Sequence, residues 1–385
     1  MALIGQNKHI AVCGMVLGDA PPRGSHVVMW TLAKAFAQMG YIVDFVVFAT
    51  PEKTFPWPVP ENIRLVRLSK SSHFKSWVDL VRYALRERPD VLLCNGTRAN
   101  AYAPFLPRLK PPCVFAVLHT MLSEEFKQWY GIKRWRKVKA ARALLKLDGV
   151  IAVSNAVAED FKKLTGAASA PVQTIHNPLD LVYIRQKATD PVYHNFFAKG
   201  PVILGVGALV KNKNFSMLLQ AFAKLPKDLN VHLIILGEGK EKTNLLTLAQ
   251  KLGIADRFDL PGFVDNPYAW MAKSRMVVVT SKAEGFCNVL AEAQALGVPA
   301  IATRCPGGPK EILEHGRYGL LVNIDDSEAL AVAILQTLEK PPKPYLLQQA
   351  AHRFSPEQVA NDYLDCFFAN RCHAAMMPAK AAKER

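Results

Sequence analysis

The chain has 385 residues, of which 50% are hydrophobic and 21% charged, a composition typical of a globular protein too long for one hydrophobic core. Lysine and arginine outnumber aspartate and glutamate by 48 to 32, which gives a formal net charge of +16. This balance excludes an acidic disordered chain and favours an anionic partner, such as a phosphorylated molecule or an anionic membrane surface. No nucleic-acid-binding motif accompanies the charge, so a nucleic-acid partner is not expected.

Targeting and redox signals are also informative. No stretch resembles a secretion signal, and no apolar run reaches the roughly 18–20 residues that span a membrane. The seven cysteines are an odd number and show no paired metal-ligand spacing. Reduced thiols in a cytoplasmic protein are therefore expected.

The first half of the chain alternates predicted strands and helices. We expect strands at residues 9–17, 41–49, 91–94, 114–118 and 150–153, with helices at 27–38 and 76–87, a basic helical stretch at 127–146 and a further helix from 154. This alternation predicts a parallel sheet whose ligands bind beyond the carboxyl ends of the strands. Residues 1–185 are the expected first domain.

A polar, irregular segment at 186–200 is the expected linker to a second alternating series. Its strands are predicted at residues 202–206, 231–236, 258–260, 276–280 and 299–302, and its helices at 216–225, 242–252 and 289–296. We expect a second domain at 201–350, a C-terminal helical segment at 351–372 that packs back toward the first domain, and a basic tail at 373–385.

Two carboxylates bracket a predicted strand-to-helix turn in the second half. The run MVVVT at residues 276–280 is typical of a buried parallel strand, and helix formers follow at 289–296. Glu284 lies in the turn and Glu292 about one turn inside the helix, so both can face the crevice beyond the strand. Taken alone, each glutamate is more typical of a helix cap or a solvated position, and the assignment depends on the surrounding sequence.

The amides between these glutamates favour an anion. The N–H groups of a first helical turn lack partners inside the helix and attract phosphate groups. Gly285 allows close approach of the backbone to a ligand because it has no Cβ. The expected phosphate-binding amides are those of Phe286, Cys287, Asn288 and Val289. A nucleotide-sugar, with phosphates between two hydroxyl-bearing sugars, matches this arrangement.

The wider stretch SKAEGFCNVLAEAQALGVPAIATRCPGGPKEI, at residues 281–312, resembles the donor-site signature of glycosyltransferase family 4. The similarity comprises the Glu-x7-Glu spacing, a strand of small residues and the Gly-Gly-Pro-x-Glu-Ile turn at residues 307–312. It extends more thinly over nearly the whole chain. The resemblance implies an α/β protein with the GT-B fold, in which two doubly wound Rossmann-like domains face an interdomain cleft.

The resemblance also assigns the cations of the donor site. Family members place an Arg and a Lys after the first strand of the second domain, and both grip the diphosphate. Lys213 matches the lysine, whereas Ala208 stands at the arginine position. One cation that would stabilise the departing diphosphate is therefore missing. The substitutes left open are Lys211 and Arg23, which replaces a family glycine before the first helix.

Other donor contacts follow from the same resemblance. Glu284 is expected to hold hydroxyls of the donor sugar, Glu292 the ribose, and Phe263 or Val264 the nucleobase, although either apolar residue fits a core position equally well. These assignments make Glu284 and Lys213 two of the expected catalytic residues.

Two further residues of this site come from the first domain. Gly24 matches the second of two family glycines whose amides reach the donor phosphates. His119 follows a strand, where the family often has a histidine that faces the reacting sugar, and is the third expected catalytic residue. A satisfied, partly buried histidine is the alternative for His119.

A basic amphipathic stretch, KQWYGIKRWRKVKAARALLK, occupies residues 127–146 and has eight basic residues and no acidic one. Interleaved tryptophans on such a helix suit the anionic face of a bilayer, and a solvated helix that covers the sheet is an equal alternative. The expected membrane or acceptor patch consists of Lys133, Arg134, Trp135, Arg136 and Lys137.

These features predict a retaining glycosyltransferase that moves a hexose or N-acetylhexosamine from a UDP-sugar to a lipid-linked glycan or to a lipopolysaccharide or capsule acceptor. No Asp-x-Asp pair occurs, so neither a metal nor another cofactor is expected. The expected location is the inner face of the cytoplasmic membrane, with peripheral attachment. The alternatives are a nucleotide-sugar isomerase of the 2-epimerase type and a catalytically weak GT-B homologue, the latter because of Ala208.

Overall fold

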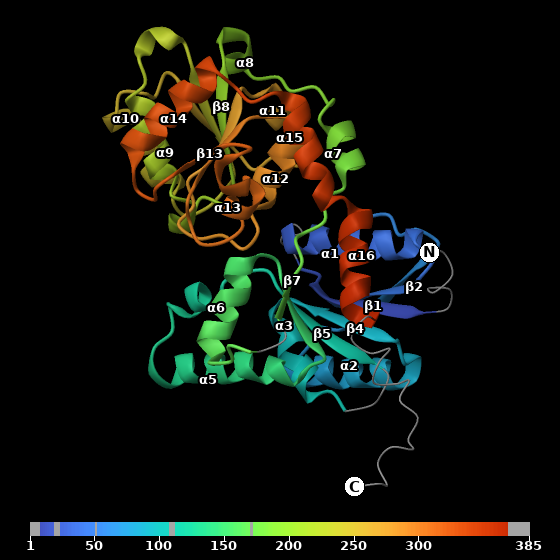
Figure 1. Cartoon of the computed structure of the whole chain (residues 1–385). Helices are drawn as coiled ribbons and strands as arrows, with labels where there is room; N and C mark the ends of the chain where they lie inside the picture. Colours follow the sequence, from blue (N-terminus) through green and yellow to red (C-terminus); the bar gives the residue numbers. More distant parts are fainter. Residues whose placement is uncertain (1–7, 19–23, 51, 108–111, 170–171, 369–385) are drawn as a thin grey trace. The chain divides into compact units, whose positions relative to one another are not determined.

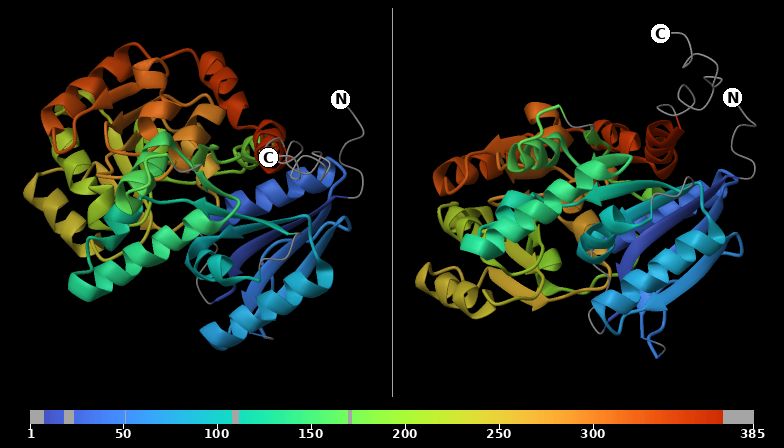
Figure 2. Two further views of the ribbon diagram at one scale, coloured as in Figure 1. Left: turned by 60° about the horizontal axis from the view of Figure 1, so that its bottom comes forward. Right: turned by 90° about the horizontal axis from the view of Figure 1, so that it is seen from below.

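The computed structural model describes residues 8–18, 24–50, 52–107, 112–169 and 172–368, which form two compact units (Figure 1). The first unit contains the described residues up to Pro178 and from Pro356 onward, and the second contains Leu179–Ser355. Each unit is a doubly wound parallel sheet with helices on both faces (Figure 2). This arrangement confirms the predicted α/β class and the two Rossmann-like domains.

Seven strands of the first unit pair in parallel, within its described residues, in the order β3-β2-β1-β4-β5-β6-β7. The strands are β1 (His9–Val16), β2 (Ile42–Ala49), β3 (Ile63–Ser69), β4 (Val91–Asn95), β5 (Cys113–Leu118), β6 (Gly149–Ala152) and β7 (Val172–Thr174). The helices are α1 (Gly24–Gln38), α2 (His73–Glu87), α3 (Gly96–Tyr102), α4 (Leu122–Phe126), α5 (Gly131–Ala143), α6 (Asn155–Thr165) and α16 (Pro356–Phe368).

Helix α16, near the end of the chain, packs against α1 of the first unit (Figure 1). The ring of Phe36 on α1 lies 6.4 Å from that of Tyr363 and 6.0 Å from that of Phe367. Phe367 also reaches Phe115 of β5, at 4.8 Å between ring centroids. Aromatic burial of this kind attaches the last described helix to the sheet that begins the chain.

Six strands of the second unit pair in parallel, among the residues described there, in the order β10-β9-β8-β11-β12-β13. The strands are β8 (Val202–Val206), β9 (His232–Leu236), β10 (Phe258–Gly262), β11 (Met276–Val279), β12 (Ala300–Thr303) and β13 (Leu320–Val322). The helices are α7 (Leu181–Lys187), α8 (Asn195–Lys199), α9 (Phe215–Ala223), α10 (Lys242–Lys251), α11 (Pro267–Lys273), α12 (Asn288–Ala295), α13 (Pro309–Ile312), α14 (Ser327–Glu339) and α15 (Pro344–Ala351).

The segment 186–200, expected as a linker, is part of the second unit, which begins at Leu179. It includes the end of α7 and all of α8. It is bonded to the rest of the unit through side chain and backbone: His194 Nε2 lies 2.7 Å from Asp259 Oδ2, and Lys273 Nζ donates to the backbone carbonyl of Val192 at 2.9 Å. Composition alone cannot distinguish polar residues that make such bonds from those of a free linker.

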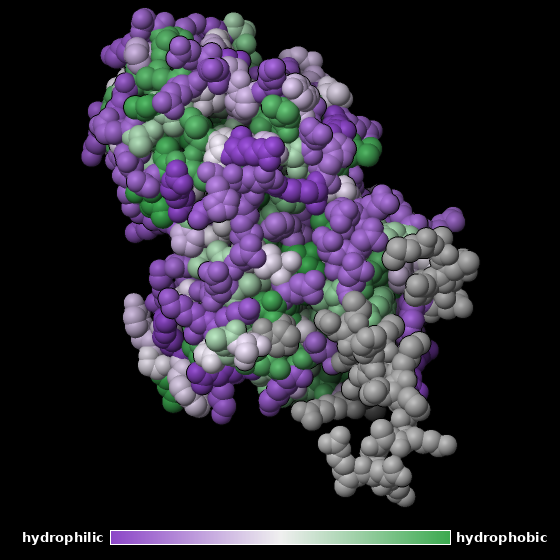
Figure 3. Space-filling view, viewed as in Figure 1, coloured by the Kyte–Doolittle hydropathy of each residue, from purple (hydrophilic) through white to green (hydrophobic). Residues whose placement is uncertain are grey.

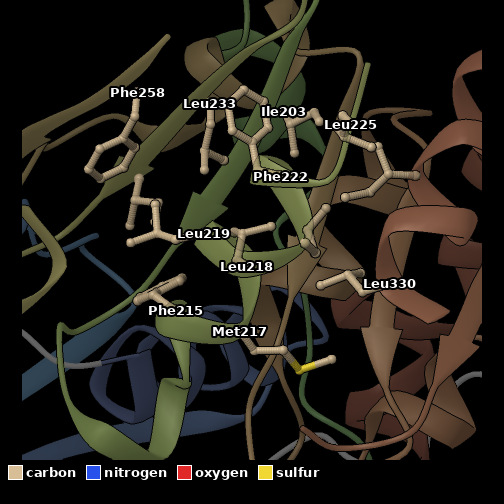
Figure 4. Close-up of a cluster of buried hydrophobic side chains, with 14 of the residues drawn as sticks. Ile203, Phe215, Met217, Leu218, Leu219, Phe222, Leu225, Leu233, Phe258 and Leu330 are labelled. Atoms are coloured by element: carbon tan, nitrogen blue, oxygen red, sulfur yellow. The ribbon is translucent and has the colours of Figure 1, made fainter. Parts of the chain in front are cut away.

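The core of the second unit lies between its sheet and helices α9, α10 and α14. Helix α9 is apolar on most of its surface, and its Leu218 and Phe222 are fully buried. Figure 4 shows Phe222 beside Ile203 of β8 and Leu233 of β9. Each such side chain contributes roughly 1.5–3 kcal/mol through burial, so α9 is a rigid support for the loop that precedes it.

Candidate active site

The strand order of the second unit reverses direction between β8 and β11, which pair side by side although they are not consecutive. Ligands of open parallel sheets bind beyond the carboxyl ends of the strands at such a switch point. The loops that follow these two strands, residues 207–214 and 280–287, are therefore where a site is expected. They carry Lys213 and Glu284.

The loop after β8 is held by neighbouring loops. The amide of Leu209 donates to the carbonyl of Glu238 at 2.8 Å, and the amide of Gly207 donates to that of Leu236 at 2.9 Å. A Cβ at Gly237 would lie 1.9 Å from the carbonyl oxygen of Gly207, so only glycine allows this approach. The Gly-x-Gly turn at residues 237–239 thus shapes the loop that carries Lys213.

Lys213 and Glu284 form an ion pair, with 2.6 Å between Nζ and Oε1. The Oγ of Ser281 donates to the same carboxylate oxygen, also at 2.6 Å. Burial lowers the pKa of Lys213, but the adjacent Glu284 carboxylate more than compensates and leaves the pKa above its usual value. Lys213 is therefore positively charged near neutral pH.

The Gly-Gly turn packs directly on the loop that carries Glu284. The amide of Glu284 donates to the carbonyl of Pro306, and the amide of Gly308 donates to that of Gly285, both at 3.0 Å. A Cβ at Gly307 would lie 2.1 Å from the carbonyl oxygen of Glu284. Gly307 also has a φ of +124°, which side chains rarely allow. The two glycines therefore fix the backbone on which Glu284 is carried.

Helix α12 begins immediately after this loop, and the residues expected as phosphate-binding amides lie at its start. Cys287 precedes the helix with a φ of 81°, a left-handed conformation that costs a non-glycine residue about 1–3 kcal/mol. The Phe286 side chain is buried against Phe354, so only its backbone can serve a ligand. Asn288 and Val289 form the first turn of α12, where the positive end of the helix dipole favours an anion.

Glu292 lies one turn further along α12, in a partly closed environment. Tyr268 of α11 places its hydroxyl 3.4 Å from Oε1 of Glu292, and the ring of Tyr183 packs edge-on against Tyr268. Burial raises the pKa of Glu292 to about 7, and the hydroxyl of Tyr268 only partly opposes this shift. Glu292 therefore changes charge near neutral pH.

The expected nucleobase residues follow β10. Phe263 is 59% exposed, and Val264 is partly exposed, so neither is a core residue. Gly262 before them has a φ of +99°, and its amide carbonyl accepts a hydrogen bond from Gly237 at 2.8 Å. An exposed phenylalanine on such a well-fixed turn is available to a planar ligand.

Gly24 and His119, the expected contributions of the first domain, lie in the first unit and are described within it. Gly24 is the first residue of α1, and His119 directly follows β5. Burial, and secondarily His26, lowers the pKa of His119 to about 4, so its imidazole is neutral. Neither ring nitrogen has a hydrogen-bond partner among the described residues. Arg23, a suggested substitute for the missing cation, lies outside the described residues.

Ala208 is exposed, and so is Lys211, the other suggested substitute. Ser281 and Tyr268 were not identified as site residues from the sequence. One feature of the sequence could have identified Ser281, since this residue directly follows a predicted buried strand and stands three residues before Glu284. The contact of Tyr268 with Glu292 could not be predicted from the sequence, because it depends on the packing of α11 against α12.

The basic stretch forms helix α5, which presents apolar and cationic side chains together. Ile132 is 74% exposed and Trp135 is 58% exposed. Lys139 lies over the ring of Trp135 at 5.0 Å, and Lys133 lies over Trp129 at 5.8 Å. Figure 3 shows hydrophobic residues among hydrophilic ones over the region where α5 lies in Figure 1. The remaining members of the patch, Arg134, Arg136 and Lys137, lie on the same helix.

No helix among the described residues is long and apolar enough to cross a membrane. In the same residues, no group of three or more histidine, cysteine, aspartate or glutamate side chains is arranged to hold a metal ion.

Two family models match consecutive parts of the chain. "Glycosyltransferase Family 4" matches residues 22–183, and "Glycosyl transferases group 1" matches residues 186–354. Together they cover most of both units.

Curated relatives match about half of the chain. The Campylobacter jejuni N-acetylgalactosamine-N,N'-diacetylbacillosaminyl-diphospho-undecaprenol 4-alpha-N-acetylgalactosaminyltransferase is 34% identical over 194 residues, which are 50% of this chain and 52% of the relative. The lipopolysaccharide core biosynthesis glycosyltransferase LpsE of Rhizobium meliloti is 34% identical over 172 residues, 43% of this chain and 49% of the relative. The chain therefore spans about half the length of these curated relatives.

The fold has close counterparts among solved structures. The crystal structure of Anabaena Alr3699/HepE in complex with UDP superposes with a TM-score of 0.75 at 21% identity, over 93% of this chain and 98% of that one. This likeness confirms the predicted GT-B type of fold.

Proposed function

The chain belongs to glycosyltransferase family 4, and on that premise we propose that it transfers a hexose or N-acetylhexosamine from a UDP-sugar to a lipid-linked glycan or a lipopolysaccharide acceptor. One observation carries the proposal: the Lys213–Glu284 ion pair lies at the switch point of the second sheet, beside the start of α12. A cation, a helix N-terminus and a carboxylate are what a diphosphate attached to a sugar requires.

Each residue has a distinct part in this proposal. Lys213 and the amides at the start of α12 bind the diphosphate and stabilise the charge that develops on it as the glycosidic bond breaks. Glu284 holds hydroxyls of the donor sugar, and Glu292 holds those of the ribose. Phe263 or Val264 contacts the nucleobase. No resident metal is proposed, since these groups carry the electrostatic role.

The first unit supplies the remaining parts of the proposal. Gly24 offers its amide to the donor phosphates. His119, neutral because burial lowers its pKa to about 4, orients a donor hydroxyl and does not add charge. For the stereochemistry we propose retention by front-side displacement, in which the leaving phosphate accepts the proton of the acceptor hydroxyl. No second carboxylate then acts as nucleophile, unlike in retaining glycosidases.

The donor and acceptor classes draw on the relatives. Anabaena HepE binds UDP in its crystal structure, which supports uridine as the nucleoside. The Campylobacter jejuni relative is named for a diphospho-undecaprenol substrate, and LpsE for lipopolysaccharide core synthesis. Lipid-linked acceptors lie at a membrane, and α5 exposes the mixture of cations and tryptophan that binds anionic bilayers. We therefore propose that the protein attaches peripherally to the inner face of the cytoplasmic membrane.

A panel of UDP- and GDP-sugars tests the proposal. Ligand binding raises the melting temperature with occupancy, so one UDP-sugar should stabilise the protein above the others. UDP release from that donor should then require a lipid-linked glycan acceptor, and the anomeric configuration of the product should match that of the donor. Proton exchange into the sugar without any acceptor would instead indicate an isomerase. Binding without UDP release across lipid-linked and lipopolysaccharide acceptors would indicate a catalytically weak homologue.

A further inference from the structure

Three buried hydroxyl groups lie at the carboxyl ends of β11 and β12, directly beneath the Lys213–Glu284 pair. Thr280, Ser281 and Thr303 are each at most 1% exposed. Thr280 Oγ1 donates to the carbonyl of Lys213 at 2.8 Å, and Thr303 Oγ1 donates to the carbonyl of Ser281 at 2.5 Å. Ser281 Oγ donates to the Glu284 carboxylate. The hydroxyls thus hold the backbone of one member of the pair and the side chain of the other.

The two donors to Glu284 converge on one oxygen. Lys213 Nζ and Ser281 Oγ each lie 2.6 Å from Oε1. Among the described residues, Oε2 receives no hydrogen bond from the protein. The carboxylate is therefore oriented through Oε1, and Oε2 remains for a hydroxyl of a ligand.

Lys213 has two roles that compete. In the described structure its ammonium neutralises Glu284, whereas the proposed function requires it at a diphosphate. Lysine is a flexible point charge, so it can move from one anion to the other. Glu284 is only 11% exposed, and a carboxylate that loses its partner in such surroundings is costly unless another donor remains. Ser281 is that donor, since its hydroxyl bonds Oε1 of Glu284 and its backbone carbonyl is held by Thr303.

We infer that Ser281, supported by Thr303, is a positioning residue that keeps Glu284 in place against the donor sugar while Lys213 engages the diphosphate. The inference rests on the proposed function, because it takes Glu284 as the sugar contact. Ser281 acts through Glu284 and does not itself touch the substrate. The sugar half of the donor should therefore depend on Ser281, and the uridine diphosphate half should not.

The test compares Ser281→Ala with Ser274→Ala in the full chain. Ser274 is also buried, and its hydroxyl donates to the carbonyl of Trp270 at 2.7 Å, away from the ion pair. The probes are UDP, measured by calorimetry, and the UDP-sugar that gives the largest thermal shift, measured by turnover. Melting temperatures establish that both variants are folded.

For Ser281→Ala we expect kcat/KM for the UDP-sugar to fall about 10- to 100-fold, as the loss of a hydrogen bond to a charged group predicts. The Kd for UDP should stay close to that of the unaltered protein, and Ser274→Ala should change neither quantity. Equal losses for UDP and UDP-sugar would overturn the inference, because Ser281 would then act on the diphosphate site. Unchanged turnover would overturn it as well.

Thr303→Val provides a second test if Ser281→Ala does not fold. Valine keeps the shape of the side chain and removes only the hydroxyl that holds the Ser281 carbonyl. The same selective loss in turnover, smaller at about 2- to 10-fold, supports the inference, and full activity contradicts it. A different result would contradict the proposed function itself: the unaltered protein would bind neither UDP nor any UDP-sugar.

Discussion

The Nζ of Lys213 lies 2.6 Å from Oε1 of Glu284, although 71 positions separate the two residues in the chain. The contact joins the loop after β8 to the loop after β11, strands that are neighbours in the sheet but not in the sequence. It places the cation that we propose for the diphosphate beside the carboxylate that we propose for the sugar hydroxyls. The following predictions depend largely on this relationship.

Replacement of Glu284 by glutamine tests its contact with the sugar. The amide keeps the size of the side chain but removes the charge that strengthens hydrogen bonds from sugar hydroxyls. Transfer should fall about 100- to 1,000-fold, the range seen when a preorganised electrostatic contact is removed, while UDP affinity changes little. Steady-state kinetics and calorimetry measure the two effects, with exposed Glu339→Gln on α14 as the control. An equal loss of UDP binding would mean that Glu284 does not contact the sugar.

Ala208→Arg restores the cation that other family members are expected to carry. Because position 208 is exposed, the added charge should tighten UDP binding by no more than about fivefold, and turnover should stay equal or rise. Ala208→Gln adds similar length without charge and serves as the control in the same calorimetric titration. A folded but inactive arginine variant would contradict the placement of position 208 at the diphosphate.

Neutralisation of α5 tests its proposed attachment to a membrane. Each cation near an anionic surface contributes about 1 kcal/mol, so replacing four with glutamine should weaken binding to phosphatidylglycerol vesicles by on the order of 100-fold or more. The substituted residues are Lys133, Arg134, Arg136 and Lys137. Turnover of a water-soluble acceptor analogue should be unaffected. Vesicle sedimentation measures the binding.

The control for this variant removes four exposed lysines from the second unit, Lys227, Lys251, Lys340 and Lys343. It lowers the net charge equally, so a loss of vesicle binding in the α5 variant alone locates the effect on that helix. Equal losses in both variants, or none in either, would show that α5 is not the membrane contact.

UDP affinity should depend on the charge of Glu292. Burial raises the pKa of this carboxyl to about 7, so it is ionised above that pH and increasingly neutral below it. Because an ionised carboxylate is the stronger acceptor for ribose hydroxyls, the Kd for UDP should increase as pH falls from about 8 to about 6, by at most tenfold per unit. The Glu292→Gln variant is the control: its Kd for UDP, measured by calorimetry at the same pH values, changes only through titration of the UDP phosphate. Identical profiles for both proteins would exclude this role.

Asp44 is predicted to stabilise the first unit. It is 1% exposed, and although burial acts to raise its pKa, hydrogen bonds from Arg64, His9 and Tyr83 hold the pKa well below its usual range. The carboxylate of β2 receives Arg64 Nε at 2.8 Å and Tyr83 Oη at 2.6 Å. Asp44→Asn should therefore lower the free energy of unfolding by about 3 kcal/mol near neutral pH.

The lowered pKa of Asp44 determines how its contribution to the free energy of unfolding changes with pH. The contribution is complete above the unfolded-chain pKa of about 3.9 and is lost as pH falls from there toward the lower pKa of the folded state, because the unfolded chain then binds a proton that the folded Asp44 does not. Urea unfolding at several pH values should show the two proteins converging in acid. Exposed Asp365→Asn on α16 serves as the control. A constant difference at all pH values would contradict the role of the charge.

Local patterns identified most of the central strands, because a buried parallel strand is a short apolar run between polar turns. Strand β3 was not predicted, since its sequence IRLVRLS includes two arginines. The structure places it at the edge of the sheet, where Arg64 reaches Asp44 of the neighbouring strand. Helix α2 begins three residues before its predicted start, because the Ser72 side chain accepts a hydrogen bond from the amide of Lys75.

The sequence by itself determined the chemistry available to this protein: the alternation that produces two doubly wound units, and the lysine, glutamates and glycines placed after particular strands. These features follow from backbone periodicity and short-range sterics, which a few consecutive residues decide. Tertiary structure alone decided which of these residues meet. The pairing of β8 with β11 brings Lys213 to Glu284, packing of α11 on α12 brings Tyr268 to Glu292, and burial sets the pKa of Glu292 and His119. The contacts depend on the order and packing of strands and helices, and the pKa shifts depend on the removal of water. No single stretch of the chain encodes either of these.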